Sequence, residues 1–312
     1  MAGTSGPPCR KEHIIISPTL RARLGVLFTV VAWGASFTAV KTALAVCSPV
    51  SVIWVRFTIG TAILGLLTFC RKDRALPRGR SWGLLALLGF LSVPFHNLLQ
   101  ATGLRTAEAA SSAWIVATSP AWVALLGWLF LKESLGLRGV LGMILAAGGV
   151  LLVVFRHRGL PVPVADALSL GNLLVLASAV NWAVFSVLSR QALQRFSPLW
   201  TTTWMMGLGW VMTTALYLPS GLWRELASLP PAVWRALAFL GVFCTGFGYA
   251  FWYEGLRHLP AAQVGSFLFL NPLSATGVAA AVLGEPLSWA LAGGGALVLA
   301  GVTLVNRRAP AR

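Results

Sequence analysis

The amino-acid sequence predicts an all-α integral membrane protein, in which ten transmembrane helices form two inverted five-helix repeats. Three observations support this fold class: few charged residues, ten long apolar stretches, and a self-similarity at a shift of 152 residues. Charged residues make up 10% of the 312-residue chain, whereas a soluble domain carries about 25%. The chain is 57% hydrophobic, with a mean hydropathy of +0.79. This composition excludes an ordinary soluble domain.

The ten apolar stretches each approach the roughly 20 residues that cross the hydrocarbon of a bilayer. In chain order they are 24–42, 49–69, 82–102, 109–131, 138–155, 168–189, 198–220, 234–253, 259–283 and 287–305. Arg56 is the strong charge that lies well inside one of them. The connections are short and contain Pro or Gly, as at Ser48-Pro49 and Ser197-Pro198, which is typical of tight loops between helices.

The net charge of +16 would suggest nucleic-acid binding in a soluble chain. Here the basic residues cluster in the gaps between apolar stretches, so we expect loop anchors and no nucleic-acid partner. With the N-terminus in the cytoplasm, 17 of the 24 Lys and Arg residues lie inside and 6 outside, and Arg56 lies within a helix. We therefore expect a multi-pass protein of the inner or plasma membrane, with both termini and a tail of residues 1–21 in the cytoplasm.

The repeat appears when residues 82–153 are compared with the residues 152 positions later. The register holds without a gap and pairs residue types that chance does not readily align, namely Trp82 with Trp234, Arg105 with Arg257, Pro120 with Pro272, and Glu133 with Glu285. A unit of five spans is odd, so the second copy must enter the membrane upside down. Inverted repeats of this kind recur in secondary transporters. We place the repeats at residues 22–156 and 165–306.

Short motifs occur in order along both halves of the chain. The first half contains Trp33-Gly34-Ala35-Ser36-Phe37, Arg56-Phe57, Gly103-Leu104, Ala109-Ala110, Pro120 and Lys132-Glu133. The second half contains Asn181-Trp182, Gly255-Leu256, Pro260-Ala261-Ala262, Asn271-Pro272 and Gly284-Glu285, but no Arg-Phe there matches Arg56-Phe57. By these motifs the sequence resembles the drug/metabolite transporter superfamily, in particular its ten-helix permeases with two EamA-type domains. The resemblance implies a membrane permease with a central cavity.

Two prolines, Pro120 and Pro272, lie near the middle of the fourth and ninth spans at pseudo-symmetric positions. Proline frees a backbone carbonyl one turn earlier, and in a membrane that carbonyl must face protein or a water-filled cavity. Ser119 and Asn271 precede them, so each place combines an opened backbone with a polar side chain. They are interpreted either as a binding region at the membrane midplane or as kinks that serve helix packing.

Helical spacing selects the other candidate substrate-binding side chains, which form polar and aromatic stripes on the first, third, fourth, sixth, eighth and ninth spans. The full candidate set is Trp33, Ser36, Arg56, His96, Asn97, Gln100, Ser112, Ser119, Asn181, Trp182, Tyr249, Trp252, Gln263 and Asn271. Arg56 is expected either to contact substrate or to pair with backbone carbonyls or Glu108. His96 is expected either to take part in transport or to be a neutral, hydrogen-bonded core residue. Glu133 and Glu285 are expected to cap or brace helix junctions.

The fifth and tenth spans offer mainly Gly and Ala, including Gly142, Gly149, Gly294 and Gly301. Small residues permit close helix packing, so these spans are expected to be peripheral or to form a homodimer. The four cysteines form no CxxC pair, and the four histidines are isolated from one another. We therefore expect no disulfide framework, metal, cofactor or catalytic centre. The lipid bilayer and a small-molecule substrate are the expected partners.

These features favour a secondary transporter that exports a small metabolite, an amino-acid-like solute or a drug by alternating access. No P-loop is present, which argues against ATP hydrolysis by this chain. Two alternatives come from other classes: a membrane sensor or binding protein without transport, and an integral-membrane enzyme.

Overall fold

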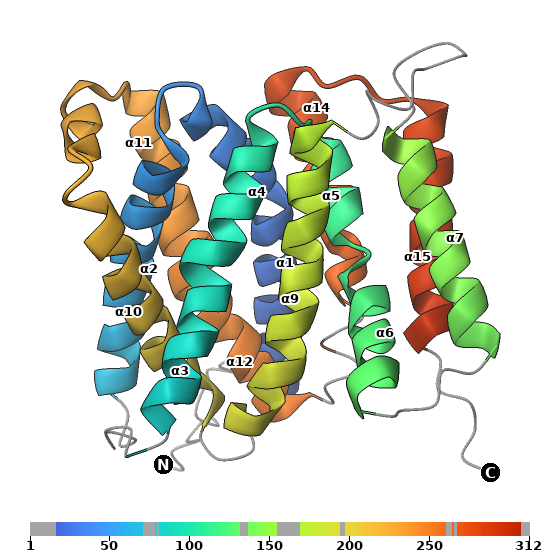
Figure 1. Cartoon of the computed structure of the whole chain (residues 1–312), viewed down its shortest axis with the longest axis horizontal. Coiled ribbons are helices and arrows are strands. Elements are labelled where there is room, and N and C mark those ends of the chain that lie inside the picture. The colour runs from blue at the N-terminus through green and yellow to red at the C-terminus, as the bar shows by residue number, and fades with distance from the viewer. Residues whose placement is uncertain are drawn as a thin grey trace, which may run out of the picture.

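The computed structural model describes residues 17–70, 79, 81–131, 137–154, 169–193, 197–259, 264 and 267–306, and the regular elements in these ranges are all helices. Figure 1 shows that the helices stand side by side as an upright bundle. Within the described residues, six helical stretches are long and apolar enough to cross a membrane: Pro18–Leu44, Pro49–Phe69, Ser81–Leu104, Ala109–Phe130, Leu170–Ser189 and Pro231–Gly255. Shorter apolar helices cover Leu137–Val153, Asn271–Leu283 and Trp289–Leu304. The chain is therefore an all-helical, multi-pass membrane protein.

Three of the described helices follow a serine at the N-cap position and have proline as their first residue. They are α1 (Pro18–Leu44), α2 (Pro49–Phe69) and α10 (Pro198–Tyr217). The serine hydroxyls of Ser17 and Ser48 accept backbone N–H groups of the first turn, and the proline follows where its missing N–H costs no hydrogen bond. This local chemistry fixes where α1 and α2 begin.

The third and eighth predicted spans each contain a π-helical segment. The third is made of α3 (Ser81–Phe90), η1 (Leu91–Phe95) and α4 (His96–Leu104), and the eighth of α11 (Pro231–Ala238), η4 (Phe239–Phe247) and α12 (Gly248–His258). A π-helix leaves some backbone carbonyls without their usual partner. Those carbonyls are free to accept hydrogen bonds from other helices.

The fourth predicted span is broken next to Pro120, where the sequence predicts an opened backbone. It consists of α5 (Ala109–Val116) and α6 (Ser119–Leu131), separated by a turn at residues 117–118, directly before Pro120. In the ninth span a short 3-10 turn, η5 (Phe267–Leu270), precedes α14 (Asn271–Leu283), and Pro272 again lies at the start of the following helix. Because proline removes a backbone donor, both α-helices restart at it.

The remaining elements are α7 (Leu137–Val154), α9 (Leu170–Leu193), the 3-10 segment η3 (Leu222–Ser228) and α15 (Trp289–Asn306). Neighbours in space mostly come from different halves of the sequence: α1 packs against α12 and α14, α2 against η4 and α10, and α4 against α9. The pair α7 and α15 lies at one edge of the bundle (Figure 1). There the backbones meet through glycines, because a Cβ added at Gly149 would lie 2.6 Å from the carbonyl oxygen of Gly294.

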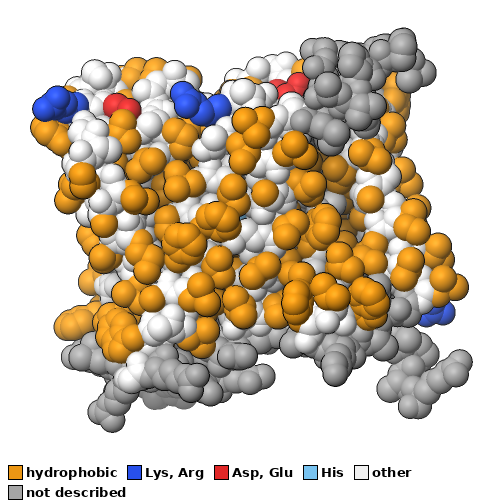
Figure 2. Space-filling view, in the orientation of Figure 1, with side chains coloured by type: hydrophobic (Ala, Val, Ile, Leu, Met, Phe, Trp, Pro, Cys, Tyr) orange, Lys and Arg blue, Asp and Glu red, His pale blue; other side chains and the backbone are white. Residues whose placement is uncertain are grey.

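The surface of the bundle is apolar around its middle. Figure 2 shows hydrophobic side chains spread over this band, with the visible Lys, Arg, Asp and Glu side chains at its ends. Large hydrophobic side chains that are exposed include Leu141, Ile144 and Val211. An exposed apolar belt between charged ends fits a bilayer.

Candidate functional site

The side chain of Arg56 lies inside the bundle, where α2, α4 and η4 meet. Only 9% of the residue is exposed. Its Nε donates to Oγ1 of Thr245 at 2.9 Å, and its Nη1 lies 3.5 Å from Oδ1 of Asn97. The guanidinium also lies 5.4 Å from the ring centre of Phe57. Its partners within the described residues are therefore neutral.

Side chains around Arg56 are held by carbonyls at the π-helical segments. In η1, the carbonyls of Ser92 and Val93 accept from the Asn97 amide, both at 2.9 Å, and the carbonyl of Leu91 accepts from the Asn181 amide at 2.8 Å. In η4, the carbonyl of Leu240 accepts from the Thr245 hydroxyl at 3.1 Å, and the carbonyl of Cys244 accepts from the Trp33 indole at 2.8 Å. Since Asn97 and Thr245 each donate to the backbone, their oxygens are oriented to accept from Arg56. The two segments thus position the groups that contact the guanidinium.

An aromatic group from α1 and α12 lies near this centre. The ring of Trp33 is 5.2 Å from that of Tyr249 and 5.2 Å from that of Trp252. Trp33 also donates to the carbonyl of Cys244, the residue before the Thr245 that contacts Arg56, which places this aromatic group beside the centre. The centre therefore combines one cation, amide and hydroxyl groups, and a cluster of large rings.

His96 and Asn97 are adjacent in sequence but contact different helices. Nδ1 of His96 lies 3.2 Å from the carbonyl oxygen of Ser178 on α9, and its ring is 5.3 Å from that of Trp182. Asn181 joins the same helix to η1. His96 is thus hydrogen-bonded in the bundle, as one of its two interpretations predicts.

The other predicted residues lie elsewhere. The hydroxyls of Ser36 and Ser119 donate to backbone carbonyls three residues earlier, each at 2.6 Å. The hydroxyl of Ser112 is buried and has no hydrogen-bond partner in the described part of the chain. The side chains of Gln100 and Asn271 are half-buried. In the described part of the chain, Arg56 contacts Thr245, Asn97 and Phe57, and none of these predicted residues. Gln263 lies outside the described residues.

Two features of this region were not among the predicted site residues. Thr245 is the closest partner of Arg56, and the carbonyls of η1 and η4 hold its neighbours. Pro94 within η1 is a sequence signal that could have revealed this irregular backbone, because proline cannot donate in a helix. The expected alternative pairing of Arg56 with Glu108 is not seen; Glu108 accepts from Ser111 at 3.3 Å.

The expectation for Glu285 is confirmed. Its two carboxylate oxygens accept the backbone N–H groups of Ala109 and Ala110 at 2.8 and 3.0 Å, so it caps α5 from the far end of the sequence. Its repeat partner Glu133 lies outside the described residues.

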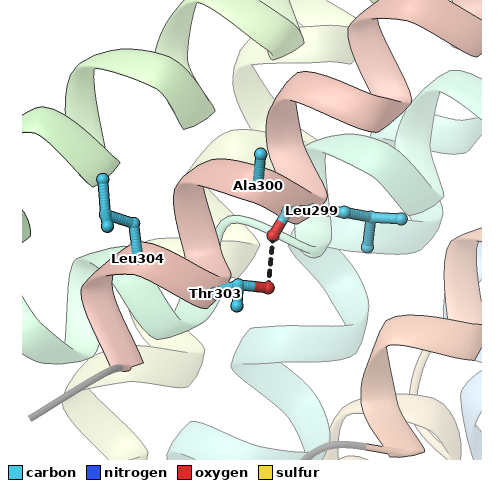
Figure 3. Close-up of a pocket in the computed structure, with 4 residues that line it drawn as sticks. All are labelled: Leu299, Ala300, Thr303 and Leu304. Carbon is cyan, nitrogen blue, oxygen red and sulfur yellow. Dashed lines mark hydrogen bonds between the residues drawn. The ribbon is translucent and has the colours of Figure 1, made fainter.

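A hollow of about 330 Å³ lies on α15, away from Arg56. It is lined by Leu299, Ala300, Thr303 and Leu304 (Figure 3). The hydroxyl of Thr303 donates to the carbonyl of Leu299 at 2.7 Å, so this lining offers no free side-chain donor. We do not place a polar solute there.

Comparison with known proteins now decides the family. Residues 20–155 and 169–307 each match the model of the EamA-like transporter family. The chain belongs to this family. Its members are transporters rather than enzymes, so this EamA-family protein is a membrane transporter.

Relatives of this EamA-family protein share its full length. An uncharacterized transporter, YvbV, of Bacillus subtilis is 29% identical over 95% of this chain and 94% of its own. A protein of Streptantibioticus cattleyicolor named as a probable terminal-alkyne amino-acid exporter is 28% identical over 92% of this chain and 94% of its own. A solved crystal structure at 22% identity superposes with a TM-score of 0.64, covering 91% of this chain and 96% of that chain, which shows a shared fold.

Proposed function

We propose that this protein exports a small amphipathic solute with one carboxylate, such as an amino-acid-like metabolite, by alternating access. The observation that carries the proposal is Arg56, a buried guanidinium whose described partners, Thr245 and Asn97, are both neutral. A buried charge without a counter-ion is costly, and a solute carboxylate would supply that counter-ion with strong, charge-assisted hydrogen bonds. Since no other described cation lies at this depth, a monocarboxylate fits better than a polyanion.

The surroundings of Arg56 support an amphipathic solute. The rings of Trp33, Tyr249 and Trp252 offer an apolar surface near the cation. Asn97 and Thr245 offer hydrogen-bonding groups. We propose that the remaining candidates line the path through the bundle: Ser36, His96, Gln100, Ser112, Ser119, Asn181, Trp182, Gln263 and Asn271, with Pro120 and Pro272 at the breaks.

Helix contacts support ten spans in two inverted repeats. The packing of α1 on α14 has its counterpart in α9 on α5 and α6, and that of α1 on α12 in α9 on α4. Likewise α2 packs on η4, and α10 packs on α3 and η1. Such reciprocal pairs are expected when a two-fold axis in the membrane plane relates the halves. Exchange of the two conformations of the halves would open opposite sides in turn.

Export, location and assembly complete the proposal. Export is supported by the name of the Streptantibioticus cattleyicolor relative, and the excess of Lys and Arg in the predicted inner loops supports cytoplasmic termini in the plasma or inner membrane. A homodimer through α7 and α15 would have to use their outward faces, since Gly149 and Gly294 already face each other within the chain.

The test is uptake into proteoliposomes by counterflow, with neutral amino acids compared with their amides and with dicarboxylates. We expect saturable exchange of monocarboxylates. The exchange rate should fall at least about tenfold in Arg56→Gln, since one charge-assisted hydrogen bond contributes about 1.5–3 kcal/mol. Arg56→Lys keeps the positive charge and should retain part of the rate. Arg235→Gln changes an exposed arginine of α11 and serves as the control. Equal transport of amides and acids, or full activity of Arg56→Gln, would refute the carboxylate site. Saturable binding of solute without exchange would favour a sensor.

A further inference from the structure

Glu285 joins three segments that are far apart in the sequence. It follows Gly284, whose left-handed backbone (φ 67°) ends α14 and turns the chain back over the bundle. Besides capping α5 at Ala109 and Ala110, its Oε1 lies 3.3 Å from Nζ of Lys41 at the end of α1. The Lys41 ammonium donates in turn to the carbonyl of Ala107 at 2.9 Å. The Glu285 side chain is only 9% exposed.

Glu225 makes a similar connection at the start of α2. This residue of η3 accepts the backbone N–H of Ser48 at 3.0 Å and the hydroxyl of Ser51 at 2.7 Å, so it caps α2 from the connection between α10 and α11. Cys47, the residue before Ser48, is 4% exposed. The free energy of such contacts is favourable because a carboxylate accepts N–H groups at the positive end of a helix.

We call these two groups the Glu285 clamp (Glu285, Lys41 and residues 107–110) and the Glu225 clamp (Glu225, Ser48 and Ser51). Both lie at the end of the bundle where α1 ends and α2, α5 and α11 begin, the upper end in Figure 1. Each ties a connection of the second half to a helix start of the first half. At the opposite end, the ion pairs in the described part of the chain join Glu254 to Arg257 and His258, all on α12.

We propose that the two clamps are the gate of this end, holding it closed in the present conformation and separating as a solute passes. Two of the elements that the clamps hold carry residues of the candidate site, Trp33 on α1 and Arg56 on α2, and α1 packs against both α2 and α5. A carboxylate can release a backbone cap and regain water without unfolding a helix, so the clamps suit reversible closure. The link to passage of solute rests on the proposed function; the closure itself does not.

Thiol labelling tests closure without any substrate. The reporter is Cys47 in full-length protein in nanodiscs, with Cys9, Cys70 and Cys244 replaced by Ser, and the probe is a polar maleimide. We expect slow labelling of Cys47 in this background and at least about tenfold faster labelling in Glu285→Gln, because loss of one charge-assisted contact shifts an open–closed equilibrium by about that factor. Glu225→Gln should accelerate labelling too. Glu254→Gln, at the opposite end, should leave the rate unchanged.

Glu285→Gln is the decisive variant, because Glu285 contacts Lys41, Ala109 and Ala110 and makes no hydrogen bond to the described residues 47–51. An unchanged labelling rate in this variant, in protein that elutes as a single folded species, would overturn the proposal. Should Glu285→Gln fail to fold, Lys41→Met keeps the helix cap, removes the ion pair, and must still raise the rate. Faster labelling without flux of any solute would uphold the gate and count against the proposed transport.

Discussion

Replacing Gly60 by alanine should separate the helices that position the candidate site. Gly60 of α2 faces Thr245 of η4, and an added Cβ would lie 2.5 Å from the Cβ of Thr245 and closer still to its Cγ2. These are branch atoms of a buried, β-branched side chain, so no flexible side-chain end can move aside. The helices must part, and Thr245 must move away from Nε of Arg56.

The change in stability expected for Gly60→Ala is the sum of two opposing contributions. Overpacking a core costs about 1–3 kcal/mol, and exchanging glycine for alanine within a helix returns about 1 kcal/mol. Gly65 lies on the same helix with no atom within 4 Å of an added Cβ, so Gly65→Ala should show only the gain. The two variants should therefore differ by about 1–3 kcal/mol in stability, or about 5- to 150-fold in the unfolding equilibrium.

The assay is reversible unfolding in mixed detergent micelles, followed by tryptophan fluorescence, together with counterflow of the best monocarboxylate. Gly60→Ala should unfold earlier than Gly65→Ala and should also transport less. Equal unfolding and equal flux in the two variants would refute the inferred packing of α2 on η4.

Three further predictions concern other parts of the molecule. Burial raises the pKa of the Cys47 thiol from its usual 9.0 to about 11, and the negative charge of Glu225 adds to the rise. The protonated thiol therefore contributes its full stabilisation below pH 9.0, and this contribution is lost as the pH rises to about 11. The rate at which maleimide labels Cys47 should climb between these two pH values, and a rate that levels off near pH 9 would count against burial. Gly149→Ala should lower the apparent melting temperature by pushing α7 from α15, whereas Gly148→Ala, with open space around it, should not. Asn181→Leu leaves the carbonyl of Leu91 without its partner and should cost about 1–3 kcal/mol in the same unfolding assay, unless water replaces the amide.

The amino-acid sequence by itself determined that this is a helical membrane protein and placed most of the helix ends. Hydropathy is a local property, and a stretch such as residues 49–69 must be a helix in lipid because no other local structure satisfies its backbone. The Ser-Pro pairs marked helix starts for the same local reason. The repeat also led to the correct expectation that Glu285 braces a helix junction, because an acidic residue recurring in a loop needs a partner.

The tertiary structure decided which side chains of different helices contact one another. Carbonyls of the π-helical segments η1 and η4 accept hydrogen bonds from Asn181 and Trp33 of distant helices, and no local pattern shows which donors will reach them. Thr245 became the partner of Arg56 for the same reason: it lies 189 residues away in sequence, and only the packing of η4 on α2 brings the two together. Local physics therefore set where this chain crosses the membrane, and contacts over long sequence separations set which polar groups face one another inside it.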